Sequence, residues 1–273
     1  MNDLQRKEFE LLKCFTEICD RLSIKYYLVC GSALGAVKYK GFIPWDDDVD
    51  VAMLRPDYER FLKEAPQHLP EEFFLQTCCS DADYPNIFAK IRNSNTTYIE
   101  KSASKLNINH GIYIDIFPLD GYPENPRSRR RLERKKYIYR RLLSLAFLPD
   151  KGWKKLIVYP LRFIFLRKQT ASLVRKYEKL ITAYPIENAQ ILANHGNWQG
   201  KKDYAPKSWF NEGIYAEFEG LKVRIPTEYE SYLRKKYGDY TQDIPESEKT
   251  GHHYYTVCDC TKPYVHYTVE KKQ

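Results

Sequence analysis

The stretch that decides both fold and chemistry is GFIPWDDDVDV, residues 41–51. It contains four carboxylates within five residues: Asp46, Asp47, Asp48 and Asp50. Valines alternate with the acids, which is typical of a half-buried strand, so the sequence predicts a strand over residues 48–53. Side chains two residues apart on a strand share a face. We therefore expect Asp46, Asp48 and Asp50 to point the same way.

Like charges in such an array repel one another and need cations, and hard oxygen ligands suit Mg²⁺ or Mn²⁺. A calcium loop is disfavoured because its position 6 would be Val51, where a glycine is needed, and its position 12 would be Asp57, where a glutamate is expected. A solvated acidic turn is the simpler alternative. The alternating valines count against it, since they indicate that one face is buried.

Around this stretch, hydrophobic periodicity predicts an α+β protein with a small mixed sheet and flanking helices. An amphipathic N-terminal helix is expected over residues 4–22 and a second helix over 56–64. Strands are expected over 26–30, 73–77, 87–91, 97–99 and 112–116. From about Asn125, long basic segments predict helices over 129–147, 153–167 and 172–183, followed by an αβ region with a helix over 228–237 and an extended tail from Ile244.

Three sequence features occur in the same order along the chain as in nucleotidyltransferases. A Gly31-Ser32 turn at a strand end lets a phosphate approach the backbone, an Asp-x-Asp pair holds metal, and Asp115, in the later Ile-Asp-Ile strand, supplies a third carboxylate. Each feature alone is weak evidence for such a site, whereas all three in this order are much less expected by chance.

The segment GSALGAVKYKGFIPWDDDVD, residues 31–50, resembles the signature of the LicD family. KIR (90–92), TT (96–97) and GIYIDIFPLD (111–120) resemble it too, and residues 226–240 do so more loosely. The resemblance implies a nucleotidyltransferase-like fold. It also implies transfer of a phospho-alcohol from a CDP donor, typically phosphocholine from CDP-choline, with ribitol or glycerol phosphate as alternatives. The acceptor would be a sugar of a cell-surface glycan, such as teichoic acid, lipopolysaccharide or capsule, or its polyprenyl-linked precursor.

Carried over to this sequence, the resemblance implies Asp46, Asp48, Asp50 and Asp115 as ligands of Mg²⁺ or Mn²⁺, with two ions expected. Asp48, Asp50 and Asp115 would be catalytic, and Asp115 is the expected general base. The expected substrate-binding residues are Gly31, Ser32, Lys38, Lys40, Trp45, Lys90, Arg92 and His253. Trp45 could stack on cytosine or on a trimethylammonium group, or belong to the core. Lys38 stands where the family usually has arginine, which replaces a bidentate phosphate contact by a point charge.

Charge divides the chain into regions. The formal net charge of +8 arises within residues 127–179, where Lys and Arg greatly outnumber the acids. We therefore expect a catalytic core (1–125), a basic helical insert (126–184) and a C-terminal αβ region that completes the catalytic domain (185–273). The basic and apolar composition of the insert is typical of helices that bind a membrane surface, and equally of helices that pack on the catalytic domain. No nucleic-acid partner is expected.

The cysteines are scattered and odd in number (seven), and the N-terminus is polar. These features predict a reduced, cytoplasmic protein, with contact to the inner membrane face left open. Two other functions remain alternatives. One is nucleotidyl transfer to a small molecule or an RNA end, with the nucleotide retained on the product. The other is a non-catalytic basic membrane-binding module, which leaves the aspartate cluster unexplained.

Overall fold

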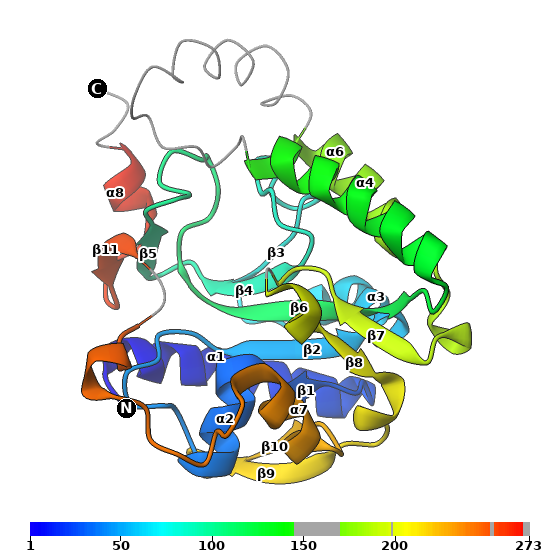
Figure 1. The fold of residues 1–273 in the computed structure, drawn as a ribbon. Helices are drawn as coiled ribbons and strands as arrows, with labels where there is room; N and C mark the ends of the chain where they lie inside the picture. Colours follow the sequence, from blue (N-terminus) through cyan, green and yellow to red (C-terminus); the bar gives the residue numbers. More distant parts are fainter. Residues whose placement is uncertain (145–169, 198, 252–253, 270–273) are drawn as a thin grey trace.

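The computed structural model describes residues 1–144, 170–197, 199–251 and 254–269 as a mixed sheet surrounded by helices (Figure 1). This arrangement confirms the expected α+β class. The strands are β1 (Tyr27–Leu28), β2 (Asp50–Leu54), β3 (Phe73–Gln76), β4 (Ala89–Asn93), β5 (Thr97–Glu100), β6 (Ile112–Tyr122), β7 (Ile191–Asn194), β8 (Tyr204–Pro206), β9 (Ile214–Phe218), β10 (Leu221–Ile225) and β11 (Tyr255–Asp259). The helices are α1 (Asp3–Leu22), α2 (Cys30–Lys38), α3 (Arg55–Glu64), α4 (Pro126–Ser144), α6 (Thr170–Ile181), α7 (Tyr229–Tyr237) and α8 (Val265–Val269).

Within the described residues, the main sheet has seven strands and is organised around the long strand β6. The first part of β6 lies between β2, which runs parallel to it, and β4, which runs antiparallel. Its second part pairs with β7, and β8 extends the sheet beyond β7. Every residue of β6 is buried. Strands from the C-terminal region therefore share one sheet with strands from the first half of the chain.

The N-terminal helix is confirmed as α1. It begins with a capping box, in which the Asn2 side chain accepts a hydrogen bond from the Gln5 N–H and the Gln5 side chain accepts one from the Asn2 N–H. Leu11, Leu12 and Phe15 bury completely in the core, where α1 packs against β4 and β6. This burial of an apolar stripe is the main source of stability for a surface helix.

Two boundaries around the acidic stretch differ from expectation. The expected strand over residues 26–30 is only the two residues of β1, and helix α2 already begins at Cys30, whose φ of 51° turns the chain sharply. Strand β2 begins at Asp50 rather than at residue 48. Residues 44–45 form a turn closed by a hydrogen bond from the Asp46 N–H to the Ile43 carbonyl, and residues 46–49 continue from it to β2 without belonging to a helix or strand. The expectation that Asp46 and Asp48 sit on a strand is therefore wrong.

Two expected helices of the basic region are present as α4 and α6, which pack against each other. The rings of Tyr139 and Tyr177 stack between them with centroids 5.7 Å apart. The helix expected over residues 153–167 lies outside the described residues. Within the described part of the chain, no helix combines the length and the apolar character needed to cross a bilayer.

The C-terminal region contains the expected helix as α7, but its tail is more structured than expected. Instead of running extended from Ile244, the tail forms strand β11, which pairs antiparallel with β5, and then the short helix α8. Figure 1 shows β5, β11 and α8 gathered at the left of the view, and α4 and α6 at the upper right. Among the described residues, β5 and β11 form a separate two-stranded sheet.

Candidate active site

A cavity of about 690 Å³ lies beside strands β2, β6 and β4. Its walls come from segments far apart in the sequence: the start of α2, the turn before β2, the segment after β7 and the end of α7. Nine residues predicted from the sequence line it: Gly31, Lys38, Trp45, Asp46, Asp48, Asp50, Lys90, Arg92 and Asp115. The fold therefore brings most of the predicted site residues to one place.

Three charged side chains form a row across the sheet at the cavity. Asp50 on β2 is the direct register partner of Asp115 on β6, and Asp115 is in turn the register partner of Lys90 on β4. Register partners on neighbouring strands place their side chains on the same face. The Lys90 Nζ lies 2.8 Å from an Asp115 carboxylate oxygen, and both side chains are at least nine-tenths buried. This ion pair fixes the Asp115 carboxylate.

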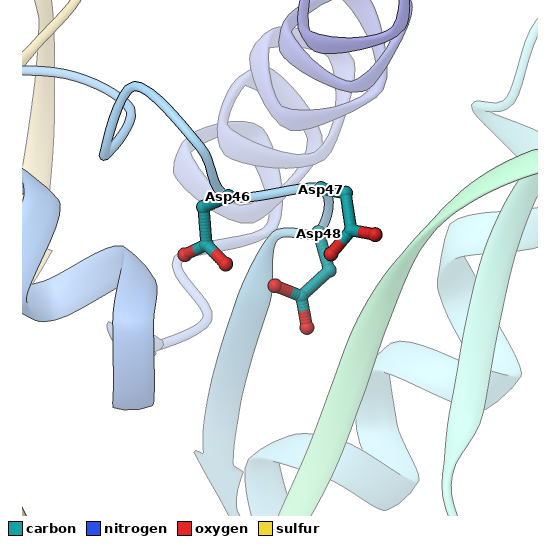
Figure 2. Close-up of side chains that lie close together, drawn as sticks. All are labelled: Asp46, Asp47 and Asp48. Carbon is teal, nitrogen blue, oxygen red and sulfur yellow. The ribbon is translucent and has the colours of Figure 1, made fainter. Parts of the chain in front are cut away.

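The turn before β2 adds further carboxylates. Asp46, Asp47 and Asp48 each offer a carboxylate oxygen within 4.8 Å of the other two. Figure 2 shows the three carboxylates directed to the same side of the turn. Burial, followed by the charges of Asp48 and Asp47, raises the pKa of Asp46 to about 8. Burial also raises the pKa of Asp50, with Asp48 and Asp115 adding to the shift.

These raised pKa values bear on whether a divalent cation fits here. Buried carboxylates that repel one another retain protons unless a positive charge replaces them. The oxygen-only donor set of Asp46, Asp48, Asp50 and Asp115 is the type preferred by Mg²⁺ and Mn²⁺. The residues present therefore fit the expected metal. Asp47, for which the sequence predicted no role, belongs to the same carboxylate group.

Gly31 and Ser32 lie in the first turn of α2, where they contact the acids. A side chain at Gly31 would place its Cβ 2.5 Å from an Asp46 carboxylate oxygen, so only glycine permits this approach. The Ser32 hydroxyl accepts a hydrogen bond of 2.8 Å from the Asp50 N–H. Ser32 is buried and does not line the cavity. In this structure both residues position aspartates.

The four predicted basic residues occupy different environments. Arg92 is fully buried, with its Nε donating to Gln76 and its Nη1 to the Gly111 carbonyl, and Lys90 is held by Asp115. Lys38 lies at the cavity wall, where its Nζ donates to Asp243 at 2.8 Å. Lys40 is exposed and does not line the cavity. The structure therefore brings three of the four to the site.

Trp45 lines the cavity and makes a T-shaped contact with Tyr39, with ring centroids 6.1 Å apart. The Lys249 Nζ lies 5.2 Å from the centroid of the Trp45 ring, so this ring already accommodates a cation. His253, the remaining predicted substrate-binding residue, lies outside the described residues.

Several residues that the fold brings to the site have no role predicted from the sequence. Tyr237, Asp239 and Tyr240 line the cavity from the end of α7 and the residues that follow it, and Asn197 lines it from the segment after β7. The first three belong to the Tyr-Gly-Asp-Tyr sequence at residues 237–240. This sequence resembles the family, but it predicts no particular function by itself. Nothing in the local sequence pointed to Asn197.

Glu8 on α1 is a further residue without a predicted role. It is only 2% exposed, and its Oε2 makes no hydrogen bond. Burial raises its pKa well above the usual value, with contributions from Asp48, Asp47, Asp46 and Asp115. The sequence does contain a sign that Glu8 is buried. This acid interrupts the apolar stripe of α1, one helical turn after Leu4 and one turn before the leucines that follow.

Comparison with known proteins identifies the family. Residues 23–141 match the family model described as LicD/FKTN/FKRP, nucleotidyltransferase domain. The chain is 33% identical over 252 residues to the lipopolysaccharide cholinephosphotransferase LicD of Haemophilus influenzae, covering 89% of this chain and 92% of that protein. It is also 31% identical over 117 residues to an uncharacterized protein of Rickettsia prowazekii, covering 43% of this chain and 40% of that one. The chain therefore belongs to the LicD family and is an enzyme of the LicD phosphotransferase type.

Proposed function

We propose that this enzyme transfers phosphocholine from CDP-choline to a sugar hydroxyl of a cell-surface glycan, with lipopolysaccharide as the first candidate acceptor, and releases CMP. In this proposal the mixed sheet has a nucleotidyltransferase-like fold and carries the reacting groups. The observation that carries it is the row of Asp50 and Asp115 on parallel strands, which faces a cavity also lined by Asp46 and Asp48. The similarity to the Haemophilus cholinephosphotransferase supports choline as the alcohol.

Asp46, Asp48, Asp50 and Asp115 are the proposed ligands of two Mg²⁺ or Mn²⁺ ions. When bound, such ions neutralise the charge of the donor phosphates and stabilise the entering and leaving oxygens of an in-line displacement. Asp115 is also the proposed general base for the acceptor hydroxyl. Its ion pair with Lys90 stabilises the charged carboxylate, which is the form that can bind a cation or accept a proton.

The rest of the cavity suggests how the donor would be held. Lys38 supplies positive charge at the cavity wall for the diphosphate, and Gly31 leaves room beside Asp46. The aromatic rings of Trp45 and Tyr39 line the cavity, and rings of this kind bind a trimethylammonium group by cation–π attraction. Asp239, on the same wall as Tyr240, adds a carboxylate that would favour a cationic alcohol over ribitol or glycerol.

Thermal unfolding with a panel of ligands tests this donor assignment. CDP-choline, CDP-ethanolamine, CDP-ribitol, CDP-glycerol, CTP and ATP are each added with and without Mg²⁺. A ligand at 100 times its dissociation constant adds about 2.7 kcal/mol to stability, which is readily visible. We expect a Mg²⁺-dependent rise in Tm with CDP-choline that exceeds the rise with the other CDP-alcohols. A rise with CTP or ATP alone would instead favour nucleotidyl transfer.

A further inference from the structure

Helix α4 carries a strongly basic outer face. Six of its basic residues are exposed: Arg127, Arg130, Arg131, Arg134, Lys135 and Arg141. They recur at steps of three and four residues, so they lie along one side of the helix. The one acid of α4, Glu133, is bound to Lys136 and Tyr204 on the inner side. The outer face of α4 therefore has no carboxylate of its own to neutralise it.

The same face exposes apolar side chains toward its C-terminal end. Tyr137 is 60% exposed, Ile138 56% and Leu142 37%, whereas the inner residues Leu132 and Leu143 are buried. Residues 134, 137, 138 and 141 follow the spacing of a single helical stripe, so the apolar group continues the basic one. A nucleic acid would satisfy the arginines but would leave the aliphatic side chains in water. An anionic bilayer surface accepts both, because its headgroups attract the charges and its interface takes the apolar groups.

The inner face of α4 connects this helix to the cavity. The Arg140 Nη2 donates to the carbonyls of His195 at 3.0 Å and Asn197 at 2.8 Å. Asn197 and its neighbour Gly196 line the cavity. A surface bound by the outer face of α4 would therefore have a fixed position relative to the cavity wall.

We propose that the outer face of α4, defined as Arg127, Arg130, Arg131, Arg134, Lys135 and Arg141 with Tyr137, Ile138 and Leu142, docks the enzyme on an anionic lipid bilayer. This interaction goes beyond the proposed transfer reaction, and it requires neither donor nor metal. The arginines supply the attraction and the apolar residues insert at the interface. Docking in this way would bring the cavity to acceptors carried on lipid.

Flotation of the full chain with vesicles tests the proposal. The vesicles contain phosphatidylglycerol and phosphatidylcholine in equal parts, or phosphatidylcholine alone. We expect binding only to the anionic vesicles, with weaker binding as the salt concentration rises. The triple variant R130E/R131E/R134E should lower the partition coefficient roughly a hundredfold or more, because each basic residue near an anionic surface contributes about a fivefold attraction. The variant I138S/L142S should bind more weakly at every salt concentration.

The matched control is K13E/K63E/K222E, which changes the net charge equally at exposed lysines outside α4. It should bind anionic vesicles much more strongly than the α4 triple variant does. Unchanged thermal unfolding of both variants shows that the fold is retained. Equal losses in the two variants, or flotation of R130E/R131E/R134E at the wild-type level, would overturn the proposal. Failure of the wild type to float, together with salt-sensitive retention on an RNA column, would assign the surface to nucleic acid instead.

Discussion

Asp50 and Asp115 are register partners on the parallel strands β2 and β6, and each is the first acid that its strand presents to the cavity. Asp50 lies at the start of β2, directly after the turn that carries Asp46, Asp47 and Asp48. Asp115 is held from the other side by Lys90. One pair of neighbouring strands therefore fixes the relative position of two acids that lie 65 residues apart in the sequence.

Replacing either member of this pair by asparagine should abolish transfer while the protein remains folded. Asp50→Asn and Asp115→Asn preserve side-chain shape but remove a charged oxygen ligand, and we expect kcat to fall by roughly 10²–10³ or more. Asp48→Asn should behave in the same way. The measurement is phosphocholine transfer at saturating Mg²⁺, with circular dichroism as the control for folding. Wild-type kcat in any of these variants would remove that residue from the proposed site.

Gly31→Ala tests the close approach of α2 to Asp46. Alanine within a helix usually stabilises a protein by up to about 1 kcal/mol relative to glycine. Here its Cβ would lie 2.5 Å from the Asp46 carboxylate, so that carboxylate must move. A displacement of about 1 Å in a catalytic group can reduce activity roughly a hundredfold. We expect activity to fall while Tm changes little, and full activity in Gly31→Ala would show that Asp46 need not occupy this position.

The carboxylate group should make stability depend on pH in a metal-sensitive way. The pKa of Asp46 is raised to about 8, and the pKa values of Asp50 and Glu8 are also raised, so the folded state retains protons that the unfolded state has lost above about pH 4. The free energy of unfolding of the metal-free protein should therefore decrease as the pH rises from about 4 to about 8. Mg²⁺ competes with those protons, so the increase in Tm that it causes should be larger at pH 8 than at pH 6.

Comparing Tm with and without Mg²⁺ at each pH isolates this effect from groups remote from the acids. His195 is one such group, because burial lowers its pKa and so gives it a pH dependence of the opposite sign. Glu8→Gln provides a further check. This variant keeps the shape of the side chain but cannot ionise, so the decrease in stability at high pH should become shallower. An identical Mg²⁺ effect at pH 6 and pH 8 would contradict a metal site built from these acids.

Asp120, although it falls in the stretch that resembles the family, should prove structural. Its carboxylate accepts two hydrogen bonds from Arg55, at 2.6 and 2.8 Å, and only 1% of its side chain is exposed. Asp120→Ala leaves the Arg55 charge almost buried without its partner, which should cost about 3–5 kcal/mol in the free energy of unfolding. The double variant R55M/D120L should lose less than Asp120→Ala does. Urea unfolding measures both, and a loss in Asp120→Ala below that of the double variant would contradict this role.

The sequence predicted those parts of the fold that depend on local signals. The cap at Asn2 and the apolar spacing that follows it define α1, and Ile114 and Ile116 on either side of Asp115 identify β6. The start of α2 could not be predicted in this way. Its first residue, Cys30, has a positive φ, and its N–H donates to the hydroxyl of Tyr232 at the other end of the chain. A boundary that depends on so distant a partner leaves no local pattern.

The same distinction applies to the site. The acids were found because they cluster in the sequence, but the assumption of a regular strand was wrong for Asp46 and Asp48. These two residues lie in the irregular segment that joins the turn at residues 44–45 to β2, and Gln5 of α1 holds its start by donating from its side chain to the carbonyls of Ile43 and Asp46. Lys40 follows the family pattern in sequence, yet it is exposed and does not line the cavity, and the chain turns there with a positive φ of 55°.

The most direct test of the proposed function is to follow both products of the reaction. Purified enzyme is incubated with Mg²⁺, CDP-choline and lipopolysaccharide that lacks phosphocholine. Mass spectrometry then measures the acceptor, and chromatography measures the released nucleotide. We predict that the acceptor gains one phosphocholine for every CMP released, and that neither product forms with Asp50→Asn. An acceptor that gains the cytidine nucleotide, or equal product formation by Asp50→Asn, would contradict the account.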